Sequence, residues 1–281
     1  MSIRVGQFQA PWMREVLVDS AYQLAAERSV LAGLFGQGYS QGVQVGYQTE
    51  GMRFTGGAFD GIGGQNTVGI TGLFGGGNYN SQNTNWNNTT TNYSFAGRAE
   101  FKISGDWSQF NDFSSAKGSE AGMMAGVAAV YQRANWNATP QSVSSSKMFG
   151  VTGDFTWDFG GASLFASGVW VNNEAADGNK TNPWGVMVQG GYFVTEEAEL
   201  FARYEFINYD TPDTGVGSNK YNGLTVGANY FFNANVKLTC DFTYNLKSLS
   251  GTNTSAALNG AGLRQDSFEN GAGVGTRTGN K

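Results

Sequence analysis

The segment 199–210, ELFARYEFINYD, alternates between apolar and charged residues. Leu200 and Tyr204 fall on one face of an extended strand, whereas Glu199 and Arg203 fall on the other, because successive side chains of a strand point to opposite faces. A strand of this kind needs water on one side and an apolar environment on the other. The pattern therefore predicts an all-β fold whose sheet separates two environments.

Other segments repeat this period of two. In 92–104 the residues Phe95 and Phe101 oppose Arg98, and in 236–246 the alternation is complete. The pattern recurs with glycine interruptions at 3–8, 43–48, 52–58, 149–157, 184–194 and 224–232. Strands are also predicted at 123–132 and 163–171, which are apolar on both faces. Together these segments give about 11 to 12 antiparallel strands of near membrane-spanning length.

The predicted connections alternate in length. Short connections lie at 50–51, 160–161, 195–197 and 233–235, and long polar ones lie at 10–40, 61–91, 134–146, 173–183 and 210–219. Short turns at one end and long loops at the other are typical of an up-and-down transmembrane β-barrel. The connection 105–122 is longer than its position at the short end predicts.

The composition indicates that much of the surface faces lipid. Charged residues make up 14% of the chain, against roughly 25% in an average soluble domain. No apolar run reaches the ~18 residues of a membrane-spanning helix, so a membrane location requires strands. The first residues, MSIRVGQFQAPW, contain no apolar core of a signal peptide, so we expect an outer-membrane protein whose signal peptide is absent from this sequence.

Charge and histidine content exclude several functions. The net charge is −5, and no basic stripe is present, which argues against a nucleic-acid partner. The chain has no histidine, which excludes Ser-His or Cys-His nucleophile pairs and His-ligated metal sites. We therefore expect no enzyme, no metal and no cofactor. A membrane β-barrel enzyme is disfavoured for the same reason.

A soluble β-sandwich binding module would show the same alternation, because it also has one buried and one wet face. Aromatic residues near strand ends favour a membrane barrel instead, since they match an interfacial girdle. Examples are Tyr192, Tyr230, Phe232 and Tyr244. A non-conducting structural barrel of the outer membrane is a further alternative.

The connection 10–40 differs from the other loops because it is rich in Ala, Leu and Glu and poor in Gly until its end. Leu17, Ala21, Leu24 and Ala25 have near-helical spacing, which predicts a helix. Two interpretations stay open. The helix could pack at the rim, or it could fold into the lumen as a constriction loop.

The basic residues predicted on the polar faces are candidates for lining a pore. Arg53, Arg98, Lys102, Arg203 and Lys237 fall on those faces. They could form a solvated wall, or they could raise the local anion concentration because low-dielectric walls focus the field. The acidic residues Glu100, Glu199, Glu205 and Asp241 lie on the same faces and weaken that field.

The chain resembles the phosphate-selective porin O and P family. The resemblance rests on IRVGQFQAPWMREVLVDSAYQLAAERS, QGVQVGYQTEGMRFTGGAFDG, GDWSQFNDF, VQGGYFVTEEAELFARYE and LTVGANYFFNANVKLTCD, taken in order. It implies part of a sixteen-stranded outer-membrane porin, with about four strands and a signal peptide preceding this sequence. It also implies a homotrimer, an inward-folding loop and a lumen that passes small anions such as phosphate.

These observations lead to one set of expectations for the whole chain. Residues 1–281 form one partial barrel domain, with 10–40 as a helical constriction loop and 251–281 as a poorly patterned terminal segment. The loop brings Arg14 or Arg28 opposite the wall charges, where we expect them to contact anions. The surrounding partner is outer-membrane lipid.

Overall fold

The computed structural model describes residues 1–62, 93–137, 143–174, 180–208, 210, 220–233 and 235–247. Its strands are β1 (Ser2–Gln9), β2 (Tyr39–Gln48), β3 (Met52–Phe59), β4 (Tyr93–Ser104), β5 (Gly122–Asn137), β6 (Val143–Asp158), β7 (Ala162–Glu174), β8 (Lys180–Thr181), β9 (Trp184–Phe193), β10 (Ala198–Asn208), β11 (Lys220–Asn233) and β12 (Val236–Lys247). Its helices are α1 (Arg14–Leu17), α2 (Val30–Phe35) and the short 3-10 turns η1 (Ser20–Tyr22) and η2 (Gln109–Asn111). Among these residues, no helix is long and apolar enough to cross a membrane.

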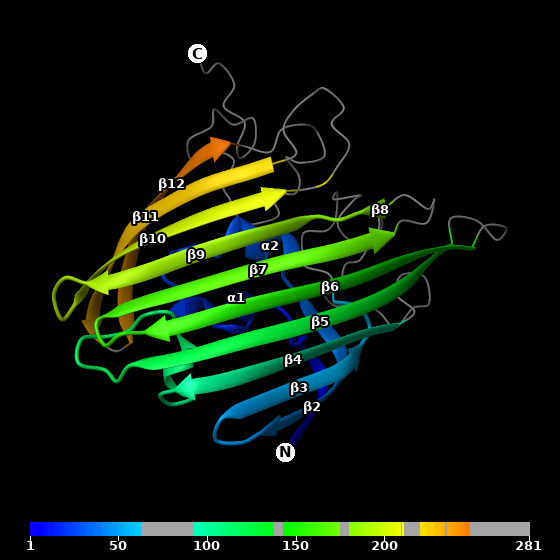
Figure 1. Cartoon of the computed structure of the whole chain (residues 1–281), viewed down its shortest axis with the longest axis horizontal. Coiled ribbons are helices and arrows are strands. Elements are labelled where there is room, and N and C mark those ends of the chain that lie inside the picture. Colours follow the sequence, from blue (N-terminus) through cyan, green and yellow to red (C-terminus); the bar gives the residue numbers. More distant parts are fainter. Residues whose placement is uncertain are drawn as a thin grey trace, which may run out of the picture.

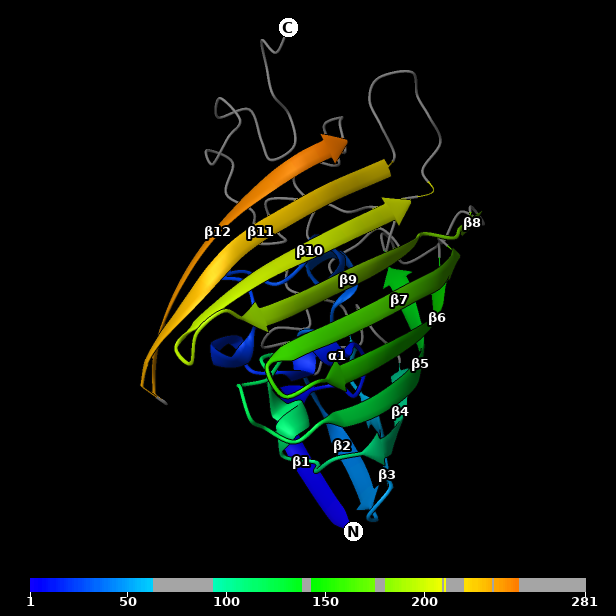
Figure 2. The same cartoon turned by 60° about the vertical axis from the view of Figure 1, so that its left-hand side comes forward.

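The strands form one 12-stranded sheet in which each long strand pairs with its neighbours in the sequence, and β8 pairs with the end of β7. All pairings are antiparallel. The sheet curves strongly around α1 and α2 (Figures 1 and 2). The all-β, up-and-down fold predicted from the sequence is confirmed. Within the described residues, β1 and β12 do not pair with each other, so the sheet is open.

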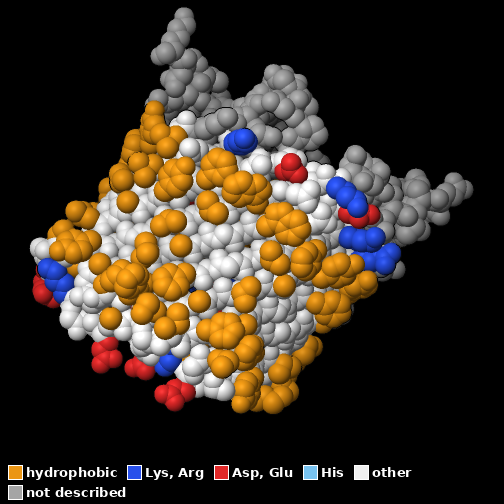
Figure 3. Space-filling view, viewed as in Figure 1, with side chains coloured by type: hydrophobic (Ala, Val, Ile, Leu, Met, Phe, Trp, Pro, Cys, Tyr) orange, Lys and Arg blue, Asp and Glu red, His pale blue; other side chains and the backbone are white. Residues whose placement is uncertain are grey.

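The convex face of the sheet carries the apolar side chains of the alternating pattern. On β10, Leu200 is 53% exposed and Tyr204 is 42% exposed, while Glu199 and Glu205 are buried on the concave side. Figure 3 shows hydrophobic side chains spread over the convex face, with charged side chains near its ends. Cys240 also lies exposed on this face, in step with the apolar positions of β12.

The concave face contacts the connection between β1 and β2, which fills the inside of the curved sheet (Figure 2). Buried side chains of this connection, including Trp12, Leu31 and Phe35, form one apolar cluster with wall residues such as Val130 and Val169. This packing explains why 123–132 and 163–171 are apolar on both faces. One face of these strands is directed outward, and the other packs against the inserted segment.

Two details differ from the sequence-based expectations. The segment contains helices, as predicted, but no helix runs through Leu17, Ala21 and Leu24: α1 ends at Leu17, and a short 3-10 turn separates it from α2. The long loop expected at 134–146 is mostly strand, because β5 and β6 pair as far as Asn137 and Val143. The terminal segment 251–281 and most of the loop 61–91 lie outside the described residues.

Candidate pore constriction

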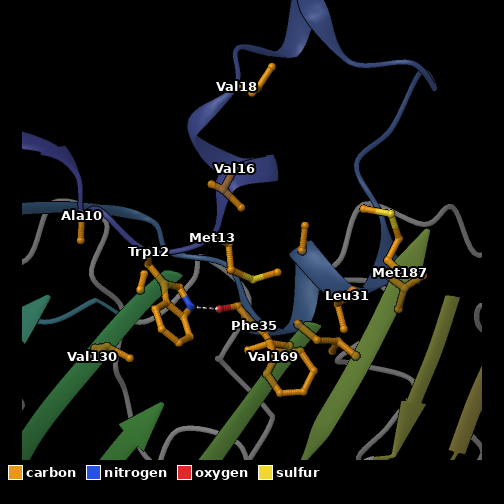
Figure 4. Packing of buried hydrophobic residues seen from close by; sticks show 14 of the residues in the cluster. Ala10, Trp12, Met13, Val16, Val18, Leu31, Phe35, Val130, Val169 and Met187 are labelled. Carbon is orange, nitrogen blue, oxygen red and sulfur yellow. Dashed lines mark hydrogen bonds between the residues drawn. The ribbon is translucent and has the colours of Figure 1, made fainter. Parts of the chain in front are cut away.

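The inserted segment, residues 10–38, is held in shape by its own hydrogen bonds. Trp12 Nε1 donates to the carbonyl of Phe35 over 2.9 Å, which ties the start of the segment to the end of α2 (Figure 4). The Met13 amide donates to Gln37 Oε1 over 3.1 Å. Ser29 caps α2 by accepting from the Ala32 amide over 2.9 Å. These bonds satisfy backbone groups that would otherwise be buried without partners.

A first ion-pair network attaches the segment to β3, β4 and β6. Glu100 accepts from Arg14 over 3.2 Å, from Arg53 over 2.5 Å and from Arg98 over 2.9 Å. Arg98 also donates to Asp154 over 2.7 Å. We call these five residues the Glu100 network. Each guanidinium group of this network is therefore paired with a carboxylate.

The Glu100 network is largely buried, so the stability of the fold depends on the pairing of its arginines with its carboxylates. Burial lowers the pKa of Arg14 to about 10, and the Glu100 carboxylate opposes that shift, so Arg14 stays charged at neutral pH. Gly126 on β5 leaves the space that Arg98 occupies, since a Cβ at this position would lie 2.3 Å from Arg98 Nη2. A buried charge without its partner would cost several kcal/mol, on the order of 3–5.

A second cluster attaches the segment to β10. Glu15 accepts from the Ser29 amide over 2.7 Å and from the Ser29 hydroxyl over 2.5 Å. Arg203 lies 3.3 Å from Glu205 and 4.0 Å from Glu15. Glu205 also accepts from the Leu31 amide, near the start of α2, over 3.0 Å. The segment is therefore fixed at two places on the inner wall.

Other cations on the inner side lack such pairing. Arg28 donates to the carbonyls of Glu15 and Val18 over 3.3 and 2.8 Å. Lys237 donates to the carbonyl of Gln23 over 2.6 Å. Lys102 lies 5.9 Å from the ring centre of Trp107. Among the described residues, no carboxylate lies within 4.0 Å of the cationic groups of Arg28, Lys102 or Lys237.

The connection 105–121 enters the concave space from the short-turn end. Its residue Phe113 is buried, with its ring centre 4.5 Å from that of Phe165 on β7. The Phe113 amide donates to the carbonyl of Tyr22 over 3.1 Å, so this connection contacts the inserted segment. Ser114 donates to Glu199 over 2.9 Å. The extra residues of this connection therefore narrow the interior from the short-turn end, which is opposite to the end where the inserted segment enters.

Comparison with known proteins identifies the family. A family model described as phosphate-selective porin O and P matches residues 1–267. The chain belongs to this family.

Solved structures similar to this porin include the trimer form of in-vitro folded OmpT, an outer-membrane protein of Vibrio cholerae. It is 11% identical with a TM-score of 0.49, and the match covers 90% of this chain and 69% of that one. OmpT expressed in the outer membrane of Vibrio cholerae matches at 11% identity and a TM-score of 0.49, covering 91% of this chain and 70% of that one. No curated protein matches the sequence.

The residues of the porin that sequence reasoning missed are carboxylates. Glu100 and Glu205 were expected only to weaken the wall field, and Asp154 was not assigned a role. Their inward position could be read from the alternation, since Asp154 has the parity of the buried β6 residues Thr152 and Thr156. Their partners could not, because Arg14 and Glu100 are 86 residues apart.

Within the described residues of the porin, no three Asp, Glu or Cys side chains gather closely enough to hold a metal ion. The acidic side chains of the interior instead accept from arginines, hydroxyls and backbone amides, as in the contacts of Glu100, Glu199 and Glu205.

The connection 105–121 should make porin stability depend on pH through Asp112. Burial raises the pKa of Asp112 to about 7, and the negative charge of Asp158 adds to the shift; Glu199 acts in the same direction, while the Ser114 amide and Lys237 oppose it. The folded state then keeps a proton that the unfolded state releases above about pH 4. We expect stability to fall as pH rises from about 4 to about 7.

The variant Asp112→Asn tests this expectation by removing the titrating group. It should raise the unfolding temperature of the detergent-folded protein at pH 8 and flatten the decline between pH 4 and pH 8. Asp106→Asn is the control, because Asp106 is an exposed aspartate of the same connection. If both variants follow the pH dependence of the native protein, Asp112 does not cause it.

Proposed function

We propose that the chain is a non-enzymatic porin through which small hydrophilic solutes diffuse passively, with a preference for anions such as phosphate. Family membership supports an outer-membrane barrel of porin type. The observation that carries the anion preference is a division among the inward cations. Those paired with carboxylates are Arg14, Arg53, Arg98 and Arg203. Those with no carboxylate within 4.0 Å among the described residues are Arg28, Lys102 and Lys237.

The two groups have different roles in this proposal. The paired arginines position the inserted segment, because their charge is largely compensated where they lie. The unpaired cations supply the field that attracts anions, since low-dielectric walls focus it in a narrow aqueous path. Arg28 lies on the inserted segment itself and is half-buried, which supports a role for it at the narrowing.

Assembly is part of the same proposal. In hydrocarbon every backbone polar group needs a partner, so conduction requires both open edges of the sheet to be paired. The described residues alone do not supply that pairing between β1 and β12. As a separate part of the proposal, the porin assembles as a homotrimer in outer-membrane lipid.

The test is the reversal potential of the full chain in a planar bilayer under a KCl gradient. Arg28→Ala should lower the ratio of anion to cation permeability by roughly twofold or more, because one uncompensated charge is lost from the narrowing. Lys220→Ala is the control, since Lys220 is exposed at the start of β11 with the outward parity of that strand. An unchanged ratio in Arg28→Ala would contradict the proposed role of Arg28.

A non-conducting structural barrel is the second candidate. The contact between Phe113 and Tyr22 favours it, because segments from both ends meet inside the curved sheet. Single-channel recording separates the two. Stepwise currents from the native chain would support the porin, and their absence from folded, inserted protein would support the structural barrel.

A further inference from the structure

A row of charged residues crosses the convex face near the ends of β5, β6, β7 and β8. Arg133 is the register partner of Lys147, Lys147 is the partner of Glu174, and Glu174 is the partner of Lys180. We call these four residues the basic row. Lys147 and Glu174 have the outward parity of their strands, since the residues two positions away, Phe149 and Asn172, are not buried. The row therefore lies on the outside of the sheet (Figure 3).

The charges of the basic row do not balance. Glu174 is shared by two lysines, at 3.8 Å from Lys147 and 3.5 Å from Lys180. Arg133 has no carboxylate within ion-pair distance among the described residues. Within the part of the chain that the structure describes, one carboxylate therefore faces three cations, in a protein whose net charge is −5. Exposed ion pairs contribute little to stability, so these contacts alone do not account for the concentration of positive charge.

An aromatic belt lies directly next to the basic row. Tyr131 and Phe149 are register partners one step inward along the strands. Phe149 packs edge-on against Trp170 at 6.3 Å, and Trp170 is the register partner of Trp184. Tyrosine and tryptophan on the outside of a membrane barrel gather at the level of the lipid headgroups. The row beyond this belt is thus at headgroup level, next to the apolar face.

The connections at this end place the basic row at the outer surface of the membrane. The segments 10–38, 60–92, 175–183 and 209–219 join strands at this end, and turns as short as 159–161 join them at the other. Membrane barrels carry their longer loops on the extracellular side. Basic side chains at a membrane surface attract anionic headgroups, and Arg and Lys hydrogen-bond phosphate oxygens well.

We propose that the basic row binds the phosphate of a lipid headgroup in the outer leaflet of the membrane. Arg133, Lys147 and Lys180 donate to the phosphate, and the aromatic belt contacts the acyl region beneath it. Glu174 lies between the two lysines and lowers the affinity, because it compensates part of their charge. The proposal rests on the outer-membrane location and not on solute conduction, so it can fail while the porin function stands.

The test measures lipid binding by native mass spectrometry of the full chain folded in detergent. The probes are diphosphorylated lipid A and the same lipid after phosphatase treatment. The native protein should bind the phosphorylated form more tightly. Lys147→Gln combined with Lys180→Gln should weaken that binding by at least about tenfold, because each basic residue near the surface adds to the attraction. Lys117→Gln combined with Lys220→Gln removes the same charge elsewhere and should not weaken it.

A variant that should strengthen lipid binding provides a second test. Glu174→Gln should tighten binding of the phosphorylated lipid, whereas a purely structural ion pair predicts no gain. Equal weakening by the two lysine pairs would overturn the proposal in favour of general charge attraction. The proposal would also fail if the dephosphorylated lipid bound equally well. It would fail too if inorganic phosphate bound as tightly and the same variants abolished phosphate binding.

Discussion

Arg98→Met should release the inserted segment from the wall and lower the free energy of unfolding by about 3–5 kcal/mol. Arg98 is buried between Glu100 and Asp154, and it also donates to the carbonyl of Trp12 over 3.1 Å. Methionine fills similar volume but removes the cation that the two carboxylates share. Glu100 keeps its pairs with Arg14 and Arg53, whereas Asp154 keeps no ion pair among the described residues. Repulsion and desolvation then favour an arrangement in which the segment moves away and water enters.

Two measurements check this expectation. Urea unfolding of the detergent-folded protein gives the stability change, and single-channel recording should give a larger conductance because the narrowing is lost. Arg98→Met combined with Asp154→Leu should recover part of the lost stability, since it removes the uncompensated carboxylate. Arg4→Met is the control, because Arg4 is exposed and its guanidinium lies over the ring of Phe8, at 4.6 Å from the ring centre. A stable Arg98→Met with unchanged conductance would contradict the anchoring role.

This prediction separates two roles that the sequence could not distinguish. Arg28 and Arg98 were both candidates for lining the pore and binding anions. The contacts assign Arg98 to the buried Glu100 network, while Arg28 has a half-buried guanidinium that, among the described residues, donates to backbone carbonyls. Changes in ion preference without loss of stability are therefore expected from Arg28. Loss of stability with a wider pore is expected from Arg98.

The wall of the barrel could be predicted because its pattern is local. On β10, Leu200 and Tyr204 point outward and Glu199 and Arg203 point inward, as the period of two requires. The strand ends were predicted less well. Residues 134–137 were assigned to a loop from their composition, but they pair with β6 and extend the hairpin. Cross-strand pairing at this position overrides the weak local preference.

The interior could not be predicted to the same extent, because its contacts join distant parts of the chain. The helical spacing of Leu17, Ala21 and Leu24 did not produce one helix. Asp19 instead caps a short 3-10 turn by accepting from the Ala21 amide, and this turn separates α1 from α2. Buried partners on the wall stabilise each short helix in place of helical length. The arginines were found by their parity, but the carboxylates that bind them were not.

Trp12→Ala should have an effect of similar size, about 3–5 kcal/mol, because it removes the largest side chain at the start of the inserted segment. Trp12 is buried, its ring lies against Gly150 on β6, and its Nε1 donates to Phe35. The loss should loosen the segment near Arg98, whose guanidinium bonds the Trp12 carbonyl. Protease cleavage between α1 and α2 should therefore become faster, and conductance should rise.

Two further variants assign the cause. Trp12→Phe keeps an aromatic ring but loses the indole N–H, so it should cost only about 1 kcal/mol for the hydrogen bond to Phe35 together with a small packing loss. Trp157→Ala is the matched control on the convex face, where the side chain is 36% exposed and detergent replaces part of its contacts. Trp157→Ala should leave conductance and cleavage near native values. If it widened the pore as much as Trp12→Ala, the effect would come from a general weakening of the sheet, and the inserted segment would not be the element that narrows the interior.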